Sequence, residues 1–266
     1  MDIHRRLTEF FENLWLPYQA ITPQAGKIHA LLQHHNESVD NDHVAVRTWA
    51  DSPVQISHLE QQLFDLGFFV FDEYHLTQKN VYARSYNHSE TNTKIFLSEL
   101  NWRALPADCQ PLISAMIAQI PDSYPNGFNN GCLWRTPSYD DYCQLQQHSE
   151  YAAWLSVWGL RANHFTVFIN SLKHFTHLQQ LVDVLQQQGF ELNNAGGIIK
   201  GEEDIGLIQA STLADYQPVL FSCGSRHEIP SCYYEFAQRF DVDGELYQGF
   251  VSTSADKIFE STNSKK

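Results

Sequence analysis

Apolar and polar positions follow two different periods along the chain. In HVAVRT, residues 43–48, they alternate with the period of two that a β-strand requires. His43, Ala45 and Arg47 then share one face, and the opposite face is apolar and β-branched, suited to packing. Other stretches repeat apolar residues every three or four positions, which predicts amphipathic helices. The mixture predicts an α+β protein.

One order of elements occurs twice. Each copy begins with a strand that starts at a histidine, His43 or His164, and continues with a helical segment that ends at a glycine, Gly67 or Gly189. Three or more short strands follow: FFVFDEY, VYARSYNH and TKIFLSEL in the first copy, and FELNNA, GGIIKG, IGLIQAS and CYYEFAQRF in the second. The shared order and nearly equal spacing favour a duplicated βαβββ module over the alternative of two unrelated α+β segments.

The repeat sets the expected domain organisation. We expect a single catalytic domain over residues 1–260, made of the following parts: N-terminal helices at 1–40, a first βαβββ module at 41–103, a helical insertion at 104–160 and a second module at 161–255. Two such modules curl into a half-open barrel, and their inward side chains line one cavity. The predicted fold is therefore α+β, with the barrel surrounding the site described next.

Composition limits the partners of the chain. The net charge of −14 disfavours nucleic acid and anionic lipid, because both bind basic surfaces. No apolar run reaches the roughly 18 residues of a membrane span, and the N-terminus lacks the pattern of a secretion signal. The five cysteines are irregularly spaced without a CxxC pair, which favours reduced thiols over a zinc or iron–sulfur site. We expect a cytoplasmic protein with no nucleic-acid or membrane partner.

Strand alternation brings chemically active side chains to the inward faces of the modules. If Glu235 points inward, the inward set is His43, Ala45, Arg47, His164, Thr166, Glu235, Ala237 and Arg239. Two imidazoles and one carboxylate form the ligand set of non-haem Fe(II) oxygenases, which leaves positions open for substrate and O₂. Zn²⁺ and Mn²⁺ accept similar ligands, so residue type does not fix the metal. His227 is the substitute ligand if Glu235 faces outward.

Arg47 lies two strand alternations beyond His43, where a guanidinium would hold a substrate carboxylate bidentately. A structural salt bridge is the alternative. For Arg239 the alternatives are a second carboxylate contact and a surface ion pair. The glycine-rich segment around Lys200 lacks the Gly-Lys-Ser/Thr of a phosphate loop. The segment SCGSRHEIPSC lacks a nucleophile elbow, which argues against a hydrolase triad.

At HVAVRT, NHFTVFIN, GGIIKG and YYEFAQRF the sequence resembles the 2-oxoadipate dioxygenase/decarboxylase family, also called hydroxyglutarate synthases, of the vicinal oxygen chelate superfamily. The resemblance extends over about residues 5–255. It implies three metal ligands, His43, His164 and Glu235. It also implies that Arg47 is the catalytic residue that binds the substrate carboxylate. A weaker match at GFVS implies substrate contacts at Val251 and Ser252.

The resemblance implies a non-haem Fe(II)-dependent dioxygenase/decarboxylase. Such an enzyme would convert a 2-oxo dicarboxylic acid like 2-oxoadipate, with O₂, to CO₂ and a 2-hydroxy acid like 2-hydroxyglutarate. Zn or Mn are the alternative ions in purified protein. Two other functions stay open at this stage, a metal-dependent isomerase or lyase of glyoxalase type and a non-catalytic metal- or ligand-binding module. Oxygen consumption separates the first from a dioxygenase, and stoichiometric metal content argues against the second.

Overall fold

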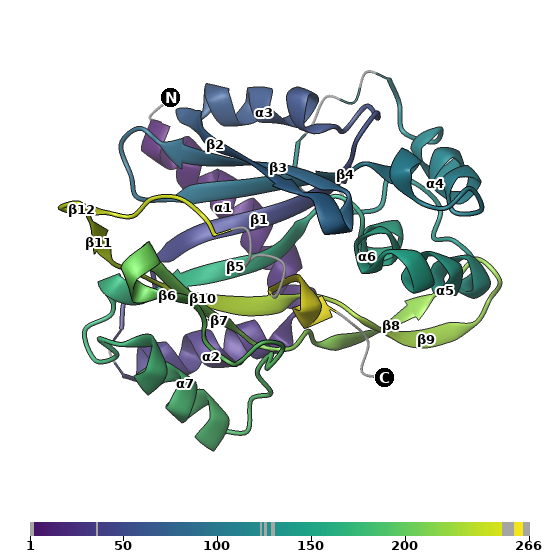
Figure 1. Cartoon of the computed structure of the whole chain (residues 1–266). Helices are drawn as coiled ribbons and strands as arrows, with labels where there is room; N and C mark the ends of the chain where they lie inside the picture. Colours follow the sequence, from purple (N-terminus) through teal and green to yellow (C-terminus); the bar gives the residue numbers. More distant parts are fainter. Residues whose placement is uncertain are drawn as a thin grey trace.

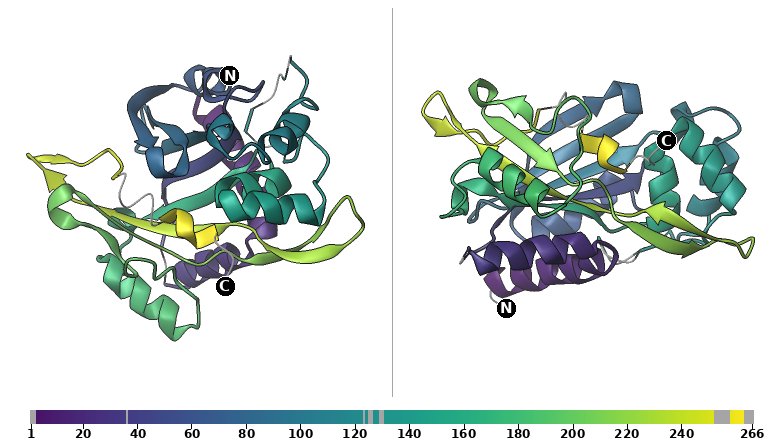
Figure 2. Two further views of the ribbon diagram at one scale, coloured as in Figure 1. Left: turned by 45° about the vertical axis from the view of Figure 1, so that its right-hand side comes forward. Right: turned by 90° about the horizontal axis from the view of Figure 1, so that it is seen from below.

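The computed structural model describes residues 3–35, 37–122, 124, 127–128, 131–251 and 258–262. Its main sheet contains eight strands: β1 (Asn41–Trp49), β2 (Phe68–Leu76), β3 (Val81–His88), β4 (Lys94–Leu100), β5 (Ala162–Phe168), β6 (Lys200–Glu202), β7 (Leu207–Ser211) and β10 (Tyr233–Arg239). They lie in the order β2-β3-β4-β1-β5-β10-β7-β6 (Figure 1). The sheet is strongly curved, and the two further views show this curvature (Figure 2).

The sheet is built from two halves with the same arrangement. β1 runs parallel to β4, β5 runs parallel to β10, and β1 pairs antiparallel with β5 where the halves join. In each half a helix follows the first strand, α3 (Ile56–Asp65) in the first and α7 (Leu178–Gln187) in the second. The predicted α+β fold with a half-open barrel is confirmed. The assignment of residues 1–260 to one catalytic domain stays a prediction.

Helices cover the outward face of the sheet and one end of it. The N-terminal helices are α1 (Ile3–Ile21) and α2 (Pro23–His34), and the insertion contains α4 (Gln110–Ile117), α5 (Tyr139–His148) and α6 (Glu150–Trp158). The apolar stripe of α1, with buried Leu7, Phe10, Leu14 and Tyr18, faces the sheet, and the Tyr18 hydroxyl donates to the Tyr233 carbonyl. In the predicted helical insertion, α5 and α6 are separate helices, because the Ser149 side chain begins α6 by accepting from the Ala152 amide.

The two faces of β1 differ as the alternation predicts. Val44 and Val46 join the main hydrophobic core between the sheet and the helices. Ala45, on the other face, belongs to a small apolar cluster inside the curled sheet, together with Phe96 and Phe250. Burial of apolar side chains on one face therefore orients the polar members of the same strand toward the interior of the barrel.

Some predicted and observed elements differ. FELNNA, residues 190–195, is not a strand and contributes only a bridge between Leu192 and Thr212. Two hairpins were not predicted, β8 (Tyr216–Leu220) with β9 (Arg226–Pro230) and β11 (Asp241–Val242) with β12 (Glu245–Leu246). The short 3₁₀ helices are η1 (Thr77–Lys79), η2 (Trp102–Ala104), η3 (Ile169–Ser171), η4 (Glu203–Ile205) and η5 (Phe259–Thr262).

Two expectations about the whole chain can be compared with the structure. Among the described residues, no helix combines the length and apolar character that crossing a bilayer requires. All five cysteines are free thiols, in agreement with the prediction of reduced cysteines.

Candidate metal site and pocket

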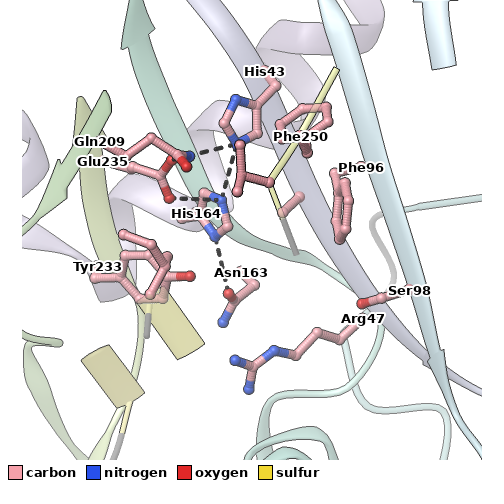
Figure 3. Close-up of a pocket in the computed structure, with 13 residues that line it drawn as sticks. His43, Arg47, Phe96, Ser98, Asn163, His164, Gln209, Tyr233, Glu235 and Phe250 are labelled. Atoms are coloured by element: carbon pink, nitrogen blue, oxygen red, sulfur yellow. Dashed lines mark hydrogen bonds and ion pairs between the residues drawn. The ribbon is translucent and has the colours of Figure 1, made fainter. Parts of the chain in front are cut away.

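His43, His164 and Glu235 converge inside the barrel, at the join of its two halves (Figure 3). They come from the neighbouring strands β1, β5 and β10. The two Nε2 atoms lie 3.3 Å apart, and the Glu235 carboxylate lies 3.3 Å from His164 Nε2 and 3.6 Å from His43 Nε2. All three side chains are buried. The structure thus brings together the three residues that the sequence singled out, while their role as ligands stays a prediction.

The three side chains fit a divalent first-row cation. Ligand atoms bound about 2.1 Å from one ion are separated by roughly 3.0 to 3.4 Å in octahedral or tetrahedral geometry, close to the three separations observed. Glu235 Oε2 is buried and accepts no hydrogen bond from any described residue. A buried carboxylate oxygen without a partner is costly, and a cation between the three groups would remove that cost. The donor types do not distinguish iron from manganese or zinc.

Burial sets the charge of each group. It raises the pKa of Glu235 to about 8 in the absence of a cation, because the charged carboxylate loses its water. Burial lowers the pKa of His43, and lowers that of His164 well below its usual value. Both imidazoles are therefore neutral near pH 7, the form that binds a metal through a ring lone pair.

A β-bulge stands directly before each histidine. The pairing of β1 with β5 slips by one residue at Asp42 and again at Asn163, so both residues leave the strict alternation. Each then faces the same way as the histidine that follows it. Asp42 Oδ1 lies 2.8 Å from His43 Nδ1, and Asn163 Oδ1 lies 3.1 Å from His164 Nδ1. Both acceptors hold the ring proton on Nδ1, which leaves Nε2 of each ring for a cation.

Sequence reasoning missed these two acceptors. A strict alternation places Asp42 and Asn163 on the outward face, and a bulge is not visible in a hydrophobic pattern. The available signal was the repeat itself, because an amide or carboxylate residue precedes the histidine in both copies.

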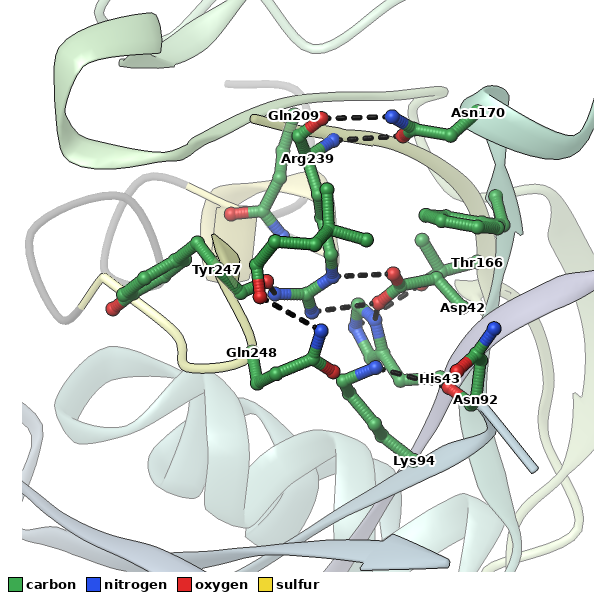
Figure 4. Close-up of polar contacts among 12 residues, drawn as sticks. Asp42, His43, Asn92, Lys94, Thr166, Asn170, Gln209, Arg239, Tyr247 and Gln248 are labelled. Carbon is green, nitrogen blue, oxygen red and sulfur yellow. Dashed lines mark hydrogen bonds and ion pairs between the residues drawn. The ribbon is translucent and has the colours of Figure 1, made fainter. Parts of the chain in front are cut away.

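Asp42 has a second partner, Arg239, which is also buried (Figure 4). Arg239 donates from Nε to Asp42 Oδ2 at 2.6 Å and from Nη2 to Asp42 Oδ1 at 2.8 Å. Its Nη1 donates to the carbonyls of Tyr247 and Gly249. The Arg239 guanidinium holds the pKa of Asp42 well below its usual range. The prediction of a surface ion pair for Arg239 is wrong, because the side chain is buried. Its partner is the buried carboxylate of Asp42, which also bonds to His43.

The converging side chains line a pocket of about 450 Å³, open solvent included. Phe96 and Phe250 form an apolar wall, with ring centroids 5.0 Å apart. Polar lining comes from Arg47, Ser98, Asn163, Gln209 and Tyr233. Val251 also lines the pocket, while Ser252 lies outside the described residues.

Arg47 lies at the end of the pocket away from His43 (Figure 3). Its Nη1 donates to Glu150 Oε1 at 2.8 Å, and its Nη2 donates to Thr262 Oγ1 at 3.3 Å. The guanidinium also lies over the rings of Tyr151 and Trp154, at 4.9 and 5.1 Å. The salt bridge considered as an alternative is therefore present, and the same side chain borders the pocket. Its predicted contact with a substrate carboxylate stays a prediction.

Other polar residues have structural partners. His227 stacks on Tyr139 at 3.4 Å on the outlying hairpin and is not a substitute ligand, because Glu235 faces inward. Lys200 donates to the carbonyls of Asn193 and Gly197. Gln209, which sequence reasoning did not single out, donates to Glu235 Oε1 from the neighbouring strand β7. Only the strand pairing identifies that contact.

Comparison with known proteins gives consistent matches. A family model described as 2-oxoadipate dioxygenase/decarboxylase matches residues 126–243. A chloroplastic 2-oxoadipate dioxygenase/decarboxylase of Arabidopsis thaliana is 30% identical over 254 residues, which are 83% of this chain and 67% of that protein. The relative is named chloroplastic, and the cytoplasmic location expected for this chain stays a prediction.

Solved structures resemble the chain over nearly its whole length. The hydroxyglutarate synthase of Oryza sativa, in complex with 2-oxoadipate, matches with a TM-score of 0.90 and 27% identity, over 98% of this chain and 93% of that one. A protein of Shewanella frigidimarina NCIMB 400, provisionally described as a hydrolase, matches with a TM-score of 0.87 and 37% identity, over 94% and 98% of the two chains.

Proposed function

The chain belongs to the 2-oxoadipate dioxygenase/decarboxylase family, and we propose that it converts a 2-oxo dicarboxylic acid and O₂ to CO₂ and a 2-hydroxy acid shorter by one carbon. With 2-oxoadipate as substrate, the second product is 2-hydroxyglutarate. The observation that supports this most strongly is the convergence of His43, His164 and Glu235 at a pocket that also contains Arg47.

His43, His164 and Glu235 would hold Fe(II), which supplies the oxygen and decarboxylation chemistry when bound. Zn(II) and Mn(II) are the alternatives in purified protein. The acceptors Asp42 and Asn163 keep both ring protons on Nδ1, so each histidine presents its Nε2 lone pair to the ion.

Arg47 would bind the carboxylate at the far end of the substrate. A guanidinium presents five N–H donors in a planar fork, so the substrate carboxylate would join Glu150 on the same cation. Fixing both ends of the substrate orients its 2-oxo group at the three ligands. Phe96 and Phe250 border the space between and exclude water from it.

An oxygen-electrode assay of Fe(II)-loaded protein against a panel of 2-oxo acids tests the proposal. We expect O₂ uptake with 2-oxoadipate or a close homologue, matched by equal amounts of CO₂ and the 2-hydroxy acid. Substrate loss without O₂ uptake would instead identify an isomerase or lyase of glyoxalase type. Absence of turnover in metal-loaded protein across the whole panel would refute the proposal.

A further inference from the structure

Asn163 uses only half of its side-chain amide within the protein. Its Oδ1 accepts from His164 Nδ1, and its Nδ2 is buried without a hydrogen-bond partner among the described residues. The residue is 1% exposed and lines the pocket. Figure 3 shows Nδ2 pointing toward the Arg47 end of the pocket. A buried N–H donor without an acceptor is unfavourable, so this atom is suited to an acceptor that arrives with a ligand.

The equivalent residue in the first half supports this interpretation. Asp42 also precedes a histidine in a bulge, but both of its carboxylate oxygens have partners. Arg239 donates to both oxygens, and His43 Nδ1 donates to Oδ1. In the second half no described residue takes the place of Arg239 and accepts from Asn163 Nδ2. The residue before the histidine thus has a different role in each half. Asp42 forms a buried ion pair with Arg239, whereas Asn163 lines the pocket.

Tyr233 adds a second donor beside Asn163. Its ring stacks on that of His164, with centroids 4.6 Å apart and an angle of 24°, and the side chain lines the pocket. Its hydroxyl makes no hydrogen bond to any described residue. In Figure 3 the hydroxyl points into the space between His164 and Asn163.

We propose that Asn163 Nδ2 and the Tyr233 hydroxyl, together with Arg47, form the subsite for the remote carboxylate of the substrate. A carboxylate only accepts hydrogen bonds and offers about four acceptor positions, so it satisfies all three groups. A 2-oxo acid with an apolar tail would offer no acceptor to this subsite and would leave Asn163 Nδ2 buried without one, so the subsite selects dicarboxylic over monocarboxylic 2-oxo acids. This inference rests on the proposed function, because it names one end of the proposed substrate.

Two substitutions separate substrate binding from the positioning of His164. Asn163→Asp keeps an oxygen that accepts from His164 Nδ1 but replaces the pocket-facing donor with a second acceptor. Tyr233→Phe removes the hydroxyl and keeps the stacked ring. Tyr234→Phe is the matched control, because the Tyr234 hydroxyl is also buried without a partner but does not line the pocket.

The measurement is calorimetric titration of anaerobic Fe(II)-loaded protein with 2-oxoadipate and with 2-oxohexanoate, its monocarboxylic analogue. Asn163→Asp should raise the Kd of 2-oxoadipate about 10- to 100-fold, and Tyr233→Phe about 10-fold, the usual effect of losing a hydrogen bond to a charged group. Tyr233→Phe should leave the Kd of 2-oxohexanoate and of Fe(II) within about twofold. Asn163→Asp adds a negative charge near the ion, so it should not weaken Fe(II) binding, and it should weaken 2-oxoadipate about tenfold more than 2-oxohexanoate. Tyr234→Phe should change none of the three.

Equal weakening of both acids, or loss of Fe(II) affinity in Asn163→Asp, would overturn the inference by showing that Asn163 only orients His164. Unchanged binding of 2-oxoadipate by both variants would also overturn it. If Asn163→Asp does not fold, the Tyr233→Phe result decides. Failure of the unsubstituted protein to bind any 2-oxo acid would instead reject the proposed function itself.

Discussion

The buried pair of Asp42 and Arg239 makes a quantitative prediction about stability. Arg239→Met keeps an unbranched side chain of similar length but removes four hydrogen bonds, two to Asp42 and one each to the carbonyls of Tyr247 and Gly249. The Asp42 carboxylate would remain buried with only the ring N–H of His43. Breaking a buried ion pair on one side costs about 3–5 kcal/mol, a large share of the roughly 5–15 kcal/mol that stabilises a typical domain.

The double substitution Asp42→Asn with Arg239→Met should recover part of this loss. An asparagine at position 42 would accept from His43 Nδ1 through its oxygen, as Asn163 does for His164, without a buried charge. We expect the double variant to be more stable than Arg239→Met alone by about 2 kcal/mol, because the cost of an uncompensated charge disappears.

Urea unfolding of the metal-free protein, followed by circular dichroism, measures these differences through the midpoint and slope. Arg103→Met is a suitable control, since its ion pair with Asp51 is exposed and such pairs contribute less than about 1 kcal/mol. A loss below 1 kcal/mol in Arg239→Met would refute the reasoning. So would a double variant that is no more stable than Arg239→Met.

Further predictions concern the candidate metal site and pocket. Glu235→Gln should reduce bound Fe(II) to well below one ion per chain, measured by elemental analysis, with the circular dichroism spectrum unchanged. Arg47→Ala should weaken 2-oxoadipate binding by about 2–5 kcal/mol, roughly 30- to several-thousand-fold in Kd, the cost of breaking a desolvated charge pair; calorimetry that shows an unchanged Kd would exclude the carboxylate contact. Removing the ion with a chelator should lower the thermal midpoint, because an ion present at about 100 times its Kd stabilises the folded state by about 2.7 kcal/mol; identical midpoints would argue against a bound ion. Phe96→Glu should raise Fe(II) affinity and abolish 2-oxo acid binding in the same calorimetric experiment, while retention of 2-oxo acid binding would contradict the position assigned to this side chain.

The sequence alone predicted the strands that carry the candidate ligands, because their physical signal is local. The alternation around His43 places apolar residues on one face, and burial of that face determines where the imidazole points. The same argument places Glu235 inside, in a strand whose other face carries Phe236 and Tyr234 in the core.

Contacts between distant segments could not be predicted in the same way. Glu150 reaches Arg47 from a helix in the insertion, and nothing local indicates where that helix docks. It is fixed by Tyr151, whose hydroxyl bonds to backbone groups of both β1 and β4. The hairpin β8–β9 was missed because Pro218 breaks the usual pattern of a strand, although proline is tolerated in a two-stranded edge.

The two halves of the barrel differ at one position beside the candidate metal site. Glu235 pairs with Thr166, two residues beyond His164, and the corresponding pair in the first half joins Ala45 to Phe96. Phe96 therefore occupies the position in the first half that Glu235 occupies in the second half. A duplication with a carboxylate at both positions would present four side chains to the ion, whereas the apolar Phe96 would leave that side of the ion to a reactant.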